Sequence, residues 1–596
     1  MKKTTTKLLS LLLVMLMLMS LALTSCKPGE STDDTTSSAE TTIVDDVPVI
    51  QTKAEFIVDG TTEFAIVRPE KTSTTVIDAV VDFREKVSEY LTEGLTGIKL
   101  KDDFIKRDET ISSTEKVILI GLTNRPESAA AHKDLGICGY RVVVLNGKVV
   151  IAAYTTKAYT TAINELIKHI KDNLTESGSF TFEENFLIEG VAEEQLISAL
   201  PMAEGSSVTA IHDMGDNNKL VILNNATADK FEDYKKQLAA KGFEEYATNT
   251  IGDNLFATYK NSENLVTAYY TKYSGEIRVN IEPLSMTTLA PREEDNKYTA
   301  VTTPLLTQIG VERKGNSSSY QNGMSYLFRL SDGSFIIYDG GFSNSNIDSK
   351  KLNDAMVSQA PDPNNITIAA WVLTHAHGDH YGGFISFNSL YSPNTASSKY
   401  TIELVIRNTP TETDSKGAEN SSTSKQIAIE NTLKSRGVSL LKTHPGQVYY
   451  IRDAKITVLY NLEMFVPSNF TYFNTSTTVT KLELAGQSFM MLGDCSEDGS
   501  RIIVKTYDKD FMMCDFVQVA HHGYQGGTTA LYSLIDPYYV LWPMGTGDYA
   551  TYKFKTRSEY LLSSAKVVDI YNAAYFKYVF QLPFNGSNYT KTEYAS

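Results

Sequence analysis

A chain of 596 residues is too long for a single hydrophobic core, so we expect about three or four domains. Its formal net charge of −16 argues against binding of extended nucleic acid through a broad basic face. The 42% hydrophobic content and 34 tyrosines favour folded, β-rich material. The four cysteines are widely spaced, and three remain if Cys26 is modified, so we expect free, buried thiols rather than a disulfide framework.

The N-terminus is typical of an export signal. A lysine-rich start precedes an apolar run over residues 8–19, which is shorter than the roughly 20 residues of a membrane span. The following Leu23-Thr24-Ser25-Cys26 resembles the bacterial lipobox, whose cysteine is acylated after cleavage. The resemblance implies a lipoprotein signal peptide over residues 1–26, lipidation of Cys26, and an extracytoplasmic protein lipid-anchored to the bacterial cell membrane.

Two small domains are expected next, after a flexible linker over residues 27–47 that is rich in Ser, Thr and Asp. Residues 48–195 alternate strand and helix patterns, with a buried-strand pattern at 117–121, a helix at 156–173 and a hairpin turn at Asn146-Gly147. With Gly121-Leu-Thr-Asn-Arg-Pro-Glu-Ser128, this segment resembles the small α/β domain of β-hexosaminidases. That resemblance implies no catalysis by the segment itself. Contact with polysaccharide remains a role open to these domains.

Residues 207–284 predict a compact α+β domain. Strand patterns occur at 219–223, 254–259, 265–270 and 277–281, and Thr227 is a plausible N-cap for a helix through Ala240. The domain has no constellation of reactive side chains. His212 is isolated in sequence, and we expect it to be structural.

Residues 300–596 carry the chemical motifs. A strand pattern at 366–373 leads directly into Thr374-His375-Ala376-His377-Gly378-Asp379-His380, which places four potential metal ligands within six residues. Three of the nine histidines lie here and two more at His521-His522, which argues against an ordinary surface turn. Neutral imidazoles and a carboxylate suit Zn²⁺, with Mn or Fe as alternatives.

Two later motifs also follow predicted strands. Strands at 479–484 and 489–492 lead to Gly493-Asp494, and a strand at 516–520 leads to His521-His522-Gly523. Since each candidate ligand comes directly after a strand, a sandwich of two sheets could present all of them at one rim.

The order His-x-His-x-Asp-His, Gly-Asp and His-His-Gly resembles the metallo-β-lactamase superfamily, and within it the ComEC-type competence proteins and the secreted phosphorylcholine esterases. The resemblance covers about residues 300–590 and implies an αββα sandwich that holds two divalent metal ions. The fold class expected for the chain is therefore α/β and α+β multidomain, with this sandwich preceded by the two small domains.

Carried over to this sequence, the resemblance assigns His375 and His377 to the first metal. It assigns Asp379, His380 and one of His521 and His522 to the second metal, with Asp494 bridging the two. The sequence leaves open which member of the pair is the ligand. The other could contact the substrate or donate a proton to the leaving group, so Asp379, His521 and His522 are the candidate catalytic residues. Asp339 is expected to support the loop from beneath.

The sequence departs from the superfamily pattern at two places. Most members have one more histidine between the first motif and Gly-Asp, and only His444 or Asn408 could replace it here. Tyr524 stands where the competence-type domains usually have serine. Arg407, Tyr524 and Lys505 are candidate phosphate contacts, and Cys495 is expected to be a core thiol. The polar stretch 409–425 is either a disordered lid or without function.

The expected activity follows from the metals. Two ions that share Asp494 would lower the pKa of a bridging water, so that hydroxide exists near neutral pH. By analogy with the two named branches, we expect an extracytoplasmic phosphodiesterase that acts on a small-molecule or cell-surface phosphodiester. One alternative is a carbon-ester or amide hydrolase for lactones or β-lactams. Another is a surface polysaccharide-binding lipoprotein with a degenerate metal domain, against which the intact first motif argues.

Overall fold

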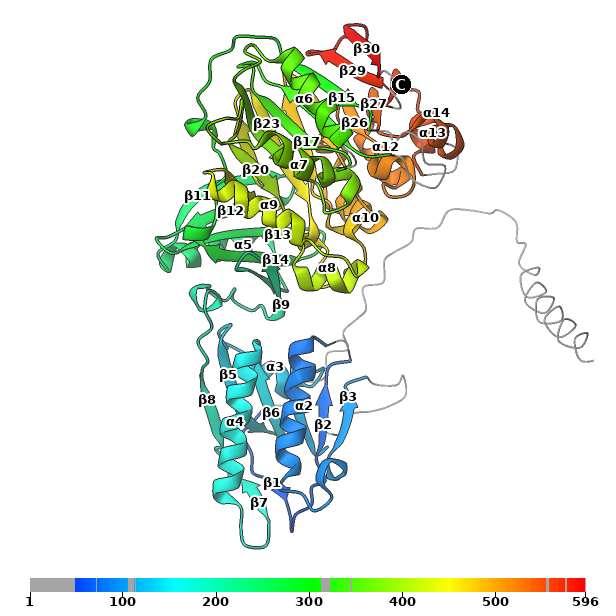
Figure 1. Cartoon of the computed structure of the whole chain (residues 1–596). Coiled ribbons are helices and arrows are strands. Elements are labelled where there is room, and N and C mark those ends of the chain that lie inside the picture. Colours follow the sequence, from blue (N-terminus) through cyan, green and yellow to red (C-terminus); the bar gives the residue numbers. More distant parts are fainter. Residues whose placement is uncertain are drawn as a thin grey trace, which may run out of the picture. The chain divides into compact units, whose positions relative to one another are not determined.

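The computed structural model describes residues 49–70, 72–104, 112, 114–311, 322–343, 346–553, 557–573 and 576–594, and the elements below are those of these residues (Figure 1). The predicted signal peptide, the predicted linker and Cys26 lie outside them. Val49–Ser596 form one unit. Within the described ranges, no helix combines the length and hydropathy that a membrane span requires.

The first part of this unit is a mixed sheet covered by helices. Its strands have the order β3-β2-β4-β6-β5-β8. They are β2 (Ala65–Arg68), β3 (Lys99–Asp102), β4 (Val117–Ile120), β5 (Gly139–Leu145), β6 (Lys148–Ala153) and β8 (Leu187–Val191), beside a separate pair of β1 (Ala54–Ile57) and β7 (Phe180–Phe182). Helices α2 (Thr74–Ser88) and α4 (Thr156–Asn173) pack on one face and α3 (Pro126–His132) on the other. The predicted hairpin is present, with positive φ at Asn146 and Gly147.

The second part, here called the accessory sheet, is antiparallel throughout. It has the order β11-β12-β13-β14-β10-β9. Its strands are β9 (Val208–Gly215), β10 (Asn218–Leu223), β11 (Glu244–Ile251), β12 (Asn254–Lys260), β13 (Asn264–Thr271) and β14 (Glu276–Pro283). Helix α5 (Ala228–Ala240) covers one face through Phe231, Tyr234 and Leu238. As predicted, Thr227 caps this helix, since its side chain accepts a hydrogen bond from the Lys230 amide.

The C-terminal part has two sheets that face each other. The first has the order β21-β20-β18-β17-β16-β15-β29-β30, with β19 paired to β18, and the second has the order β22-β23-β24-β25-β26-β27-β28. The first sheet contains β15 (Leu305–Ile309), β16 (Ser325–Arg329), β17 (Phe335–Asp339), β18 (Ile366–Val372), β19 (Tyr400–Ile402), β20 (Leu404–Arg407), β21 (Ser439–Lys442), β29 (Phe576–Gln581) and β30 (Tyr589–Glu593). The second contains β22 (Val448–Ile451), β23 (Ala454–Tyr460), β24 (Val479–Leu484), β25 (Gln487–Met491), β26 (Phe516–Gln518), β27 (Tyr539–Trp542) and β28 (Asp569–Asn572).

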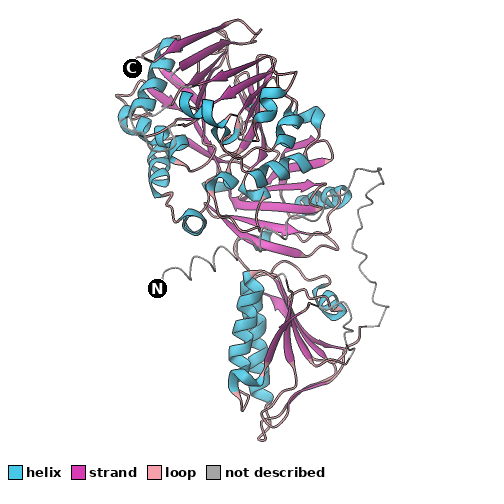
Figure 2. Cartoon of the chain, turned by 90° about the vertical axis from the view of Figure 1, so that its right-hand side faces the viewer, coloured by secondary structure: helices cyan, strands magenta, loops and turns pink. Residues whose placement is uncertain are grey.

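Three apolar cores show that this part is an αββα sandwich, as the resemblance implied (Figure 2). The central core lies between the two sheets and includes Phe328 and Phe489. The outer cores bury helices against each sheet. The helices are α6 (Ile347–Gln359), α7 (Gly378–Tyr391) and α9 (Ser424–Ser435) on the first sheet, and α10 (Glu497–Thr506), α11 (Lys509–Met512), α12 (Thr529–Ile535) and α14 (Glu559–Ser563) on the second. Helices α8 (Glu412–Glu419) and α13 (Thr546–Tyr552) complete the set in the described residues.

The stretch 409–425 differs from its prediction. It is not a disordered lid, because α8 lies within it and α9 begins at its end. Thr411 starts α8 by accepting a hydrogen bond from the Asp414 amide, 3.0 Å away, and its hydroxyl donates to the Asp414 carboxylate at 2.8 Å. Local capping therefore forms a helix where apolar periodicity gave no signal.

A buried polar cluster joins the accessory sheet to the sandwich. Its centre is Glu463, which accepts hydrogen bonds from Asn280 of β14 at 2.8 Å and from Asn408 at 2.9 Å. His444 lies between two carboxylates, with Nδ1 2.8 Å from Glu463 and Nε2 3.5 Å from Glu282. Burial alone lowers the pKa of His444, but the two carboxylates outweigh it and raise that pKa to about 9. The junction therefore holds a protonated histidine at neutral pH.

The raised pKa of His444 makes the stability of this junction dependent on pH. The folded-state pKa of His444 lies above the ordinary value near 6.5. The stabilisation of the fold by the charged His444 is therefore fully present below about pH 6.5 and is lost as pH rises towards 9. We predict that His444→Gln lowers the free energy of unfolding by on the order of 3 kcal/mol more at pH 6 than at pH 9.5, measured by urea denaturation. An equal loss at both pH values would show that His444 contributes packing alone.

Candidate metal centre

The ends of four strands position the predicted site residues. Strands β17 and β18 are parallel in one sheet and β25 and β26 are parallel in the other, so their carboxyl ends lie at one rim of the sandwich. Asp339 is the last residue of β17, and the His375–His380 loop joins β18 to α7. Asp494 lies between β25 and α10, and His521 and His522 follow β26.

The first group of candidate ligands comprises His375, His377 and Asp494. One ligand atom from each lies within 4.8 Å of the others. The Nε2 atom of His375 is 3.0 Å from Nδ1 of His377 and 3.7 Å from Oδ2 of Asp494. Both residues of the predicted His-x-His pair therefore direct a nitrogen at the same point.

The second group comprises Asp379, His380 and His522, and one ligand atom from each again lies within 4.8 Å of the others. The Nε2 atom of His522 is 3.2 Å from Nε2 of His380 and 3.2 Å from Oδ2 of Asp379. The Oδ1 atom of Asp494 is 3.1 Å from Nε2 of His380 and 3.5 Å from Nε2 of His522. Asp494 thus presents Oδ2 to the first group and Oδ1 to the second.

The outward nitrogen of each clustered imidazole has its own partner. The Nδ1 atom of His380 lies 2.7 Å from Asp339 Oδ2, and Nδ1 of His522 lies 3.1 Å from the Pro543 carbonyl oxygen. The Nδ1 atom of His375 is 3.1 Å from the Thr374 hydroxyl, and Nε2 of His377 is 3.1 Å from Oε2 of Glu419. Such partners orient a ring and fix its tautomer, which leaves the inward nitrogen available to a metal.

Asp339 also supports the loop from beneath, as predicted. Its carboxylate accepts hydrogen bonds from the Thr374 amide at 2.8 Å and from the Thr374 hydroxyl at 2.7 Å, in addition to its contact with His380. Its carbonyl oxygen accepts a bond from the Trp371 indole at 3.0 Å. Asp339 therefore fixes both the backbone that follows β18 and the orientation of the His380 ring.

The residues of the two groups fit divalent cations. Oδ1 of Asp494 is buried yet has no donor in hydrogen-bonding geometry, although imidazole nitrogens surround it. Burial lowers the pKa of His380, but Asp494, Asp379 and Asp339 outweigh it and raise that pKa well above the ordinary value. The cavity therefore favours positive charge. Imidazole nitrogens and carboxylate oxygens are the donor types that bind Zn²⁺.

The two adjacent histidines have different positions. His522 is buried within the second group, whereas His521 is 23% exposed and its Nε2 lies 3.9 Å from Asp494 Oδ2. Both have left-handed backbone, with φ of 49° and 54°, an unfavourable conformation for residues other than glycine. His522 is thus the candidate ligand of the pair, and His521 borders an adjoining pocket of about 430 Å³.

The alternatives for a third ligand of the first metal lie elsewhere. His444 and Asn408 belong to the junction cluster around Glu463, and neither is in a candidate group. Cys495 is a buried core thiol, as expected, and its burial raises its pKa to about 12. The other described cysteines, Cys138 and Cys514, are also free and buried.

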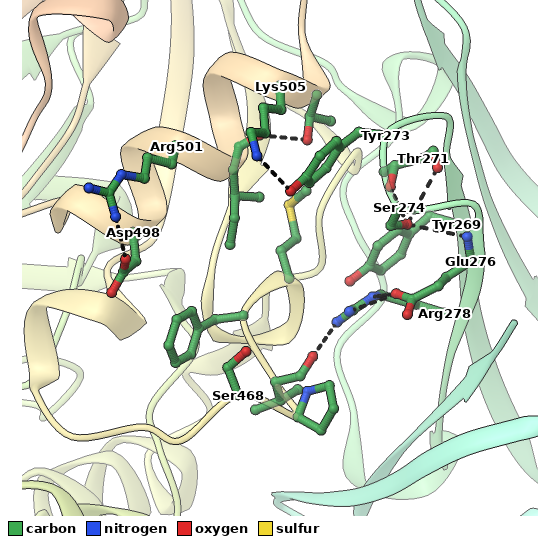
Figure 3. Close-up of a pocket in the computed structure, with 16 residues that line it drawn as sticks. Tyr269, Thr271, Tyr273, Ser274, Glu276, Arg278, Ser468, Asp498, Arg501 and Lys505 are labelled. Carbon is green, nitrogen blue, oxygen red and sulfur yellow. Dashed lines mark hydrogen bonds and ion pairs between the residues drawn. The ribbon is translucent and has the colours of Figure 1, made fainter. Parts of the chain in front are cut away.

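Two of the three predicted phosphate contacts are wrong. Arg407 is buried and bonded to Glu430 at 2.9 Å and to Asp216 of the accessory sheet at 2.8 Å. Lys505 lies in a separate pocket between the accessory sheet and α10, where its ammonium donates to the Tyr273 hydroxyl at 3.2 Å (Figure 3). Tyr524 alone borders the pocket beside His521, and its hydroxyl donates to Asp548 at 2.6 Å. Sequence does not reveal which distant carboxylate will neutralise a given cation.

Other residues around the site were not predicted. Tyr472, Glu497 and Arg557 line the pocket beside His521, and Glu497 forms an ion pair with Arg557. Glu419, at the end of α8, contacts His377. The Thr411-Glu412-Thr413-Asp414 capping pattern was the one local signal of α8, while nothing in the sequence placed its end beside the metal ligands.

Comparison with known proteins finds one family model that matches part of the chain and several solved structures that resemble parts of it. Residues 321–408 match the family model of the metallo-beta-lactamase superfamily. No curated protein matches the chain. Similar solved structures include the metallo-beta-lactamase fold protein YhfI from Bacillus subtilis, at 13% identity over 47% of this chain and 99% of that chain, with a TM-score of 0.29. Zn²⁺-bound PqqB from Methylobacterium extorquens is 10% identical over 36% of this chain and 72% of that chain, with a TM-score of 0.23. Unliganded yeast PDE1 is 13% identical over 40% and 87%, with a TM-score of 0.27.

The matched region spans the strands and the loop that carry Asp339 and His375 to His380, and it lies within the αββα sandwich. This segment of the C-terminal part is therefore similar to the metallo-beta-lactamase superfamily.

Proposed function

We propose that the protein is a metal-dependent phosphodiesterase that works outside the cytoplasm with two divalent ions. The observation that carries the proposal is the position of Asp494, which offers one oxygen to each group of candidate ligands. A carboxylate shared in this way is suited to hold two ions close together. We assign His375, His377 and Asp494 to one ion, and Asp379, His380, His522 and Asp494 to the other.

Bound metals would set the class of reaction, and the protein side chains would orient the ligands and the substrate. When bound, the ions supply Lewis acidity and bring the pKa of water near neutrality. Asp339 and the Pro543 carbonyl oxygen hold His380 and His522 in fixed orientations. His521 borders the substrate pocket, and burial lowers its pKa. A neutral His521 ring would donate a hydrogen bond to the leaving-group oxygen rather than act as an imidazolium.

The pocket beside His521 favours a polar substrate. Tyr472, Asn474, Ser496, Glu497 and Arg557 line it, so both cationic and anionic groups, as well as hydroxyl and amide groups, are available to a ligand. The guanidinium of Arg557 is paired with Glu497, but its several N–H donors also suit it to a phosphate oxygen. Glu497 and the aromatic rings are suited to a polar or cationic alcohol. A phosphodiester offers both kinds of group. The sequence resemblance to the phosphorylcholine-esterase branch supports the same class by analogy.

The proposed location rests on the N-terminal sequence. The apolar run at residues 8–19 and the lipobox-like Leu23-Thr24-Ser25-Cys26 support export and acylation of Cys26. A lipid anchor would hold the enzyme at the bacterial surface, where a small-molecule or cell-surface phosphodiester is its substrate and the N-terminal domains contact polysaccharide. The net charge of −16 disfavours extended nucleic acid.

A substrate panel tests the reaction class. We predict that the zinc- or manganese-loaded protein hydrolyses bis-p-nitrophenyl phosphate and p-nitrophenyl phosphorylcholine faster than nitrocefin. Asp379→Ala should lower kcat/KM for the phosphodiesters at least about 100-fold, because it removes a proposed direct ligand. Preferential turnover of nitrocefin or of a lactone would instead assign the site to carbon-ester or amide hydrolysis.

The adjacent histidines should respond differently to substitution. We predict that His522→Ala loses about one metal ion per chain, because His522 lies inside the second group. His521→Ala should keep both ions and lose activity. Plasma mass spectrometry and initial rates on the same preparations measure the two effects. The reverse pattern, with metal loss in His521→Ala alone, would exchange the two roles.

A further inference from the structure

Glu419 contacts the ligand His377 from the side opposite the metal group. Its carboxylate oxygens lie 3.1 and 3.2 Å from Nε2 of His377, while Nδ1 of the same ring lies 3.0 Å from His375 Nε2. The amide of Phe473 donates to Glu419 Oε1 at 2.7 Å, which holds the carboxylate in place. The rings of Tyr472 and Phe473 flank His377, with centroids 5.4 and 5.5 Å from its own.

Helix α8, which ends at Glu419, is also held at its first turn. Thr411 and Asp414 form reciprocal hydrogen bonds there. Oδ2 of Asp414 lies 3.7 Å from Nε2 of His212, which stands on β9 of the accessory sheet. The helix thus extends from the accessory sheet to the first candidate metal group. Asp414 makes the contact at one end and Glu419 the contact at the other, so the helix fixes the separation of the two.

The contact with Glu419 decides which nitrogen of His377 can bind a metal. A neutral imidazole carries one proton, and donation of that proton from Nε2 to a carboxylate leaves the Nδ1 lone pair free. That lone pair faces the first group. Asp339 gives His380 the opposite tautomer in the second group, because it contacts Nδ1 and leaves Nε2 inward. The two carboxylates therefore match the two different ligand atoms.

The contact between Glu419 and His377 should affect metal affinity more in the first group than it would in a site with three histidines. That group contains two histidines and the shared Asp494, because His444 and Asn408 lie in the junction cluster. With fewer ligands, the site depends more strongly on the orientation and basicity of each one.

We propose that Glu419 is the positioning residue of the first metal site, where its carboxylate fixes His377 with Nδ1 toward the ion. This inference rests on the proposed function, since it assigns a role within the same metal centre. Through α8, it also links the accessory sheet to the hydrolase site.

The test compares Glu419→Ala and Glu419→Gln with a matched control, Glu412→Gln. Glu412 lies in the first turn of the same helix, where its two carboxylate oxygens accept hydrogen bonds from Ser422 and Thr423. A glutamine oxygen can still accept the bonds from Thr423 while its amide nitrogen donates to the Ser422 hydroxyl, so the control removes one charge at the opposite end of the helix from Glu419. Competition with a chromogenic chelator gives the zinc affinity of each site. Nitrogen NMR of ¹⁵N-histidine-labelled, metal-free protein gives the tautomer of His377, assigned by comparison with a His377→Gln variant.

In Glu419→Ala, we expect the affinity for one of the two ions to fall about 10- to 100-fold, as is typical when the partner of a ligating histidine is lost. The Nε2-protonated signal of His377 should also be lost. Glu419→Gln should restore that signal and part of the affinity, because its amide oxygen can still accept the proton. Glu412→Gln should match the parent protein in both measurements.

Unchanged affinity for both ions in Glu419→Ala would overturn the inference while leaving the proposed function intact. Retention of the Nε2-protonated signal in that variant would overturn it as well. If the parent protein bound no metal, the proposed function would fail, whereas the NMR comparison would still report whether Glu419 fixes the His377 ring.

Discussion

Asp494 is 1% exposed, and the need to compensate its buried charge constrains the whole site. A carboxylate in such surroundings requires opposite charge or strong donors. Imidazoles of both groups surround it, and their ligand atoms come from loops on the two different sheets. Gly493 directly before it has a φ of 51°, and a Cβ atom there would lie 2.7 Å from Thr477 and 2.9 Å from Thr374. The Gly-Asp motif thus brings the carboxylate close against the first loop, where two cations could share it.

The accessory sheet contributes to this site although it has no candidate ligand among the described residues. Three of its contacts connect it to segments of the sandwich. Asp216 pairs with Arg407 at the end of β20, Glu282 faces His444 in the junction cluster, and His212 contacts Asp414 on α8. The third contact ties α8, whose last residue Glu419 contacts His377, to the antiparallel accessory sheet. In this way a contact from the accessory sheet reaches a residue that orients a candidate ligand of the first group.

The sequence predicted the parts of the site that depend on local patterns. Each candidate ligand directly follows a strand whose apolar residues were recognisable, so the clustering of His375, Asp494 and His522 could be inferred from strand ends alone. Contacts between distant segments could not be inferred in this way. The sequence does not show that Arg407 has a structural role, because its partner Asp216 lies 191 positions earlier. Glu419 was missed because α8 depends on capping and on contacts at its two ends rather than on apolar periodicity. His521 and His522 could be distinguished only by their left-handed turn, which directs one ring inward and leaves the other beside the pocket.

We propose that Asp494 stands between two metal ions. Anomalous diffraction from crystals of the zinc-loaded protein, collected on both sides of the zinc absorption edge, tests this directly. We expect two peaks, one among His375, His377 and Asp494 and the other among Asp379, His380, His522 and Asp494. A single peak in one group would reduce the centre to one ion, and the absence of any peak within reach of Asp494 would rule out a shared carboxylate.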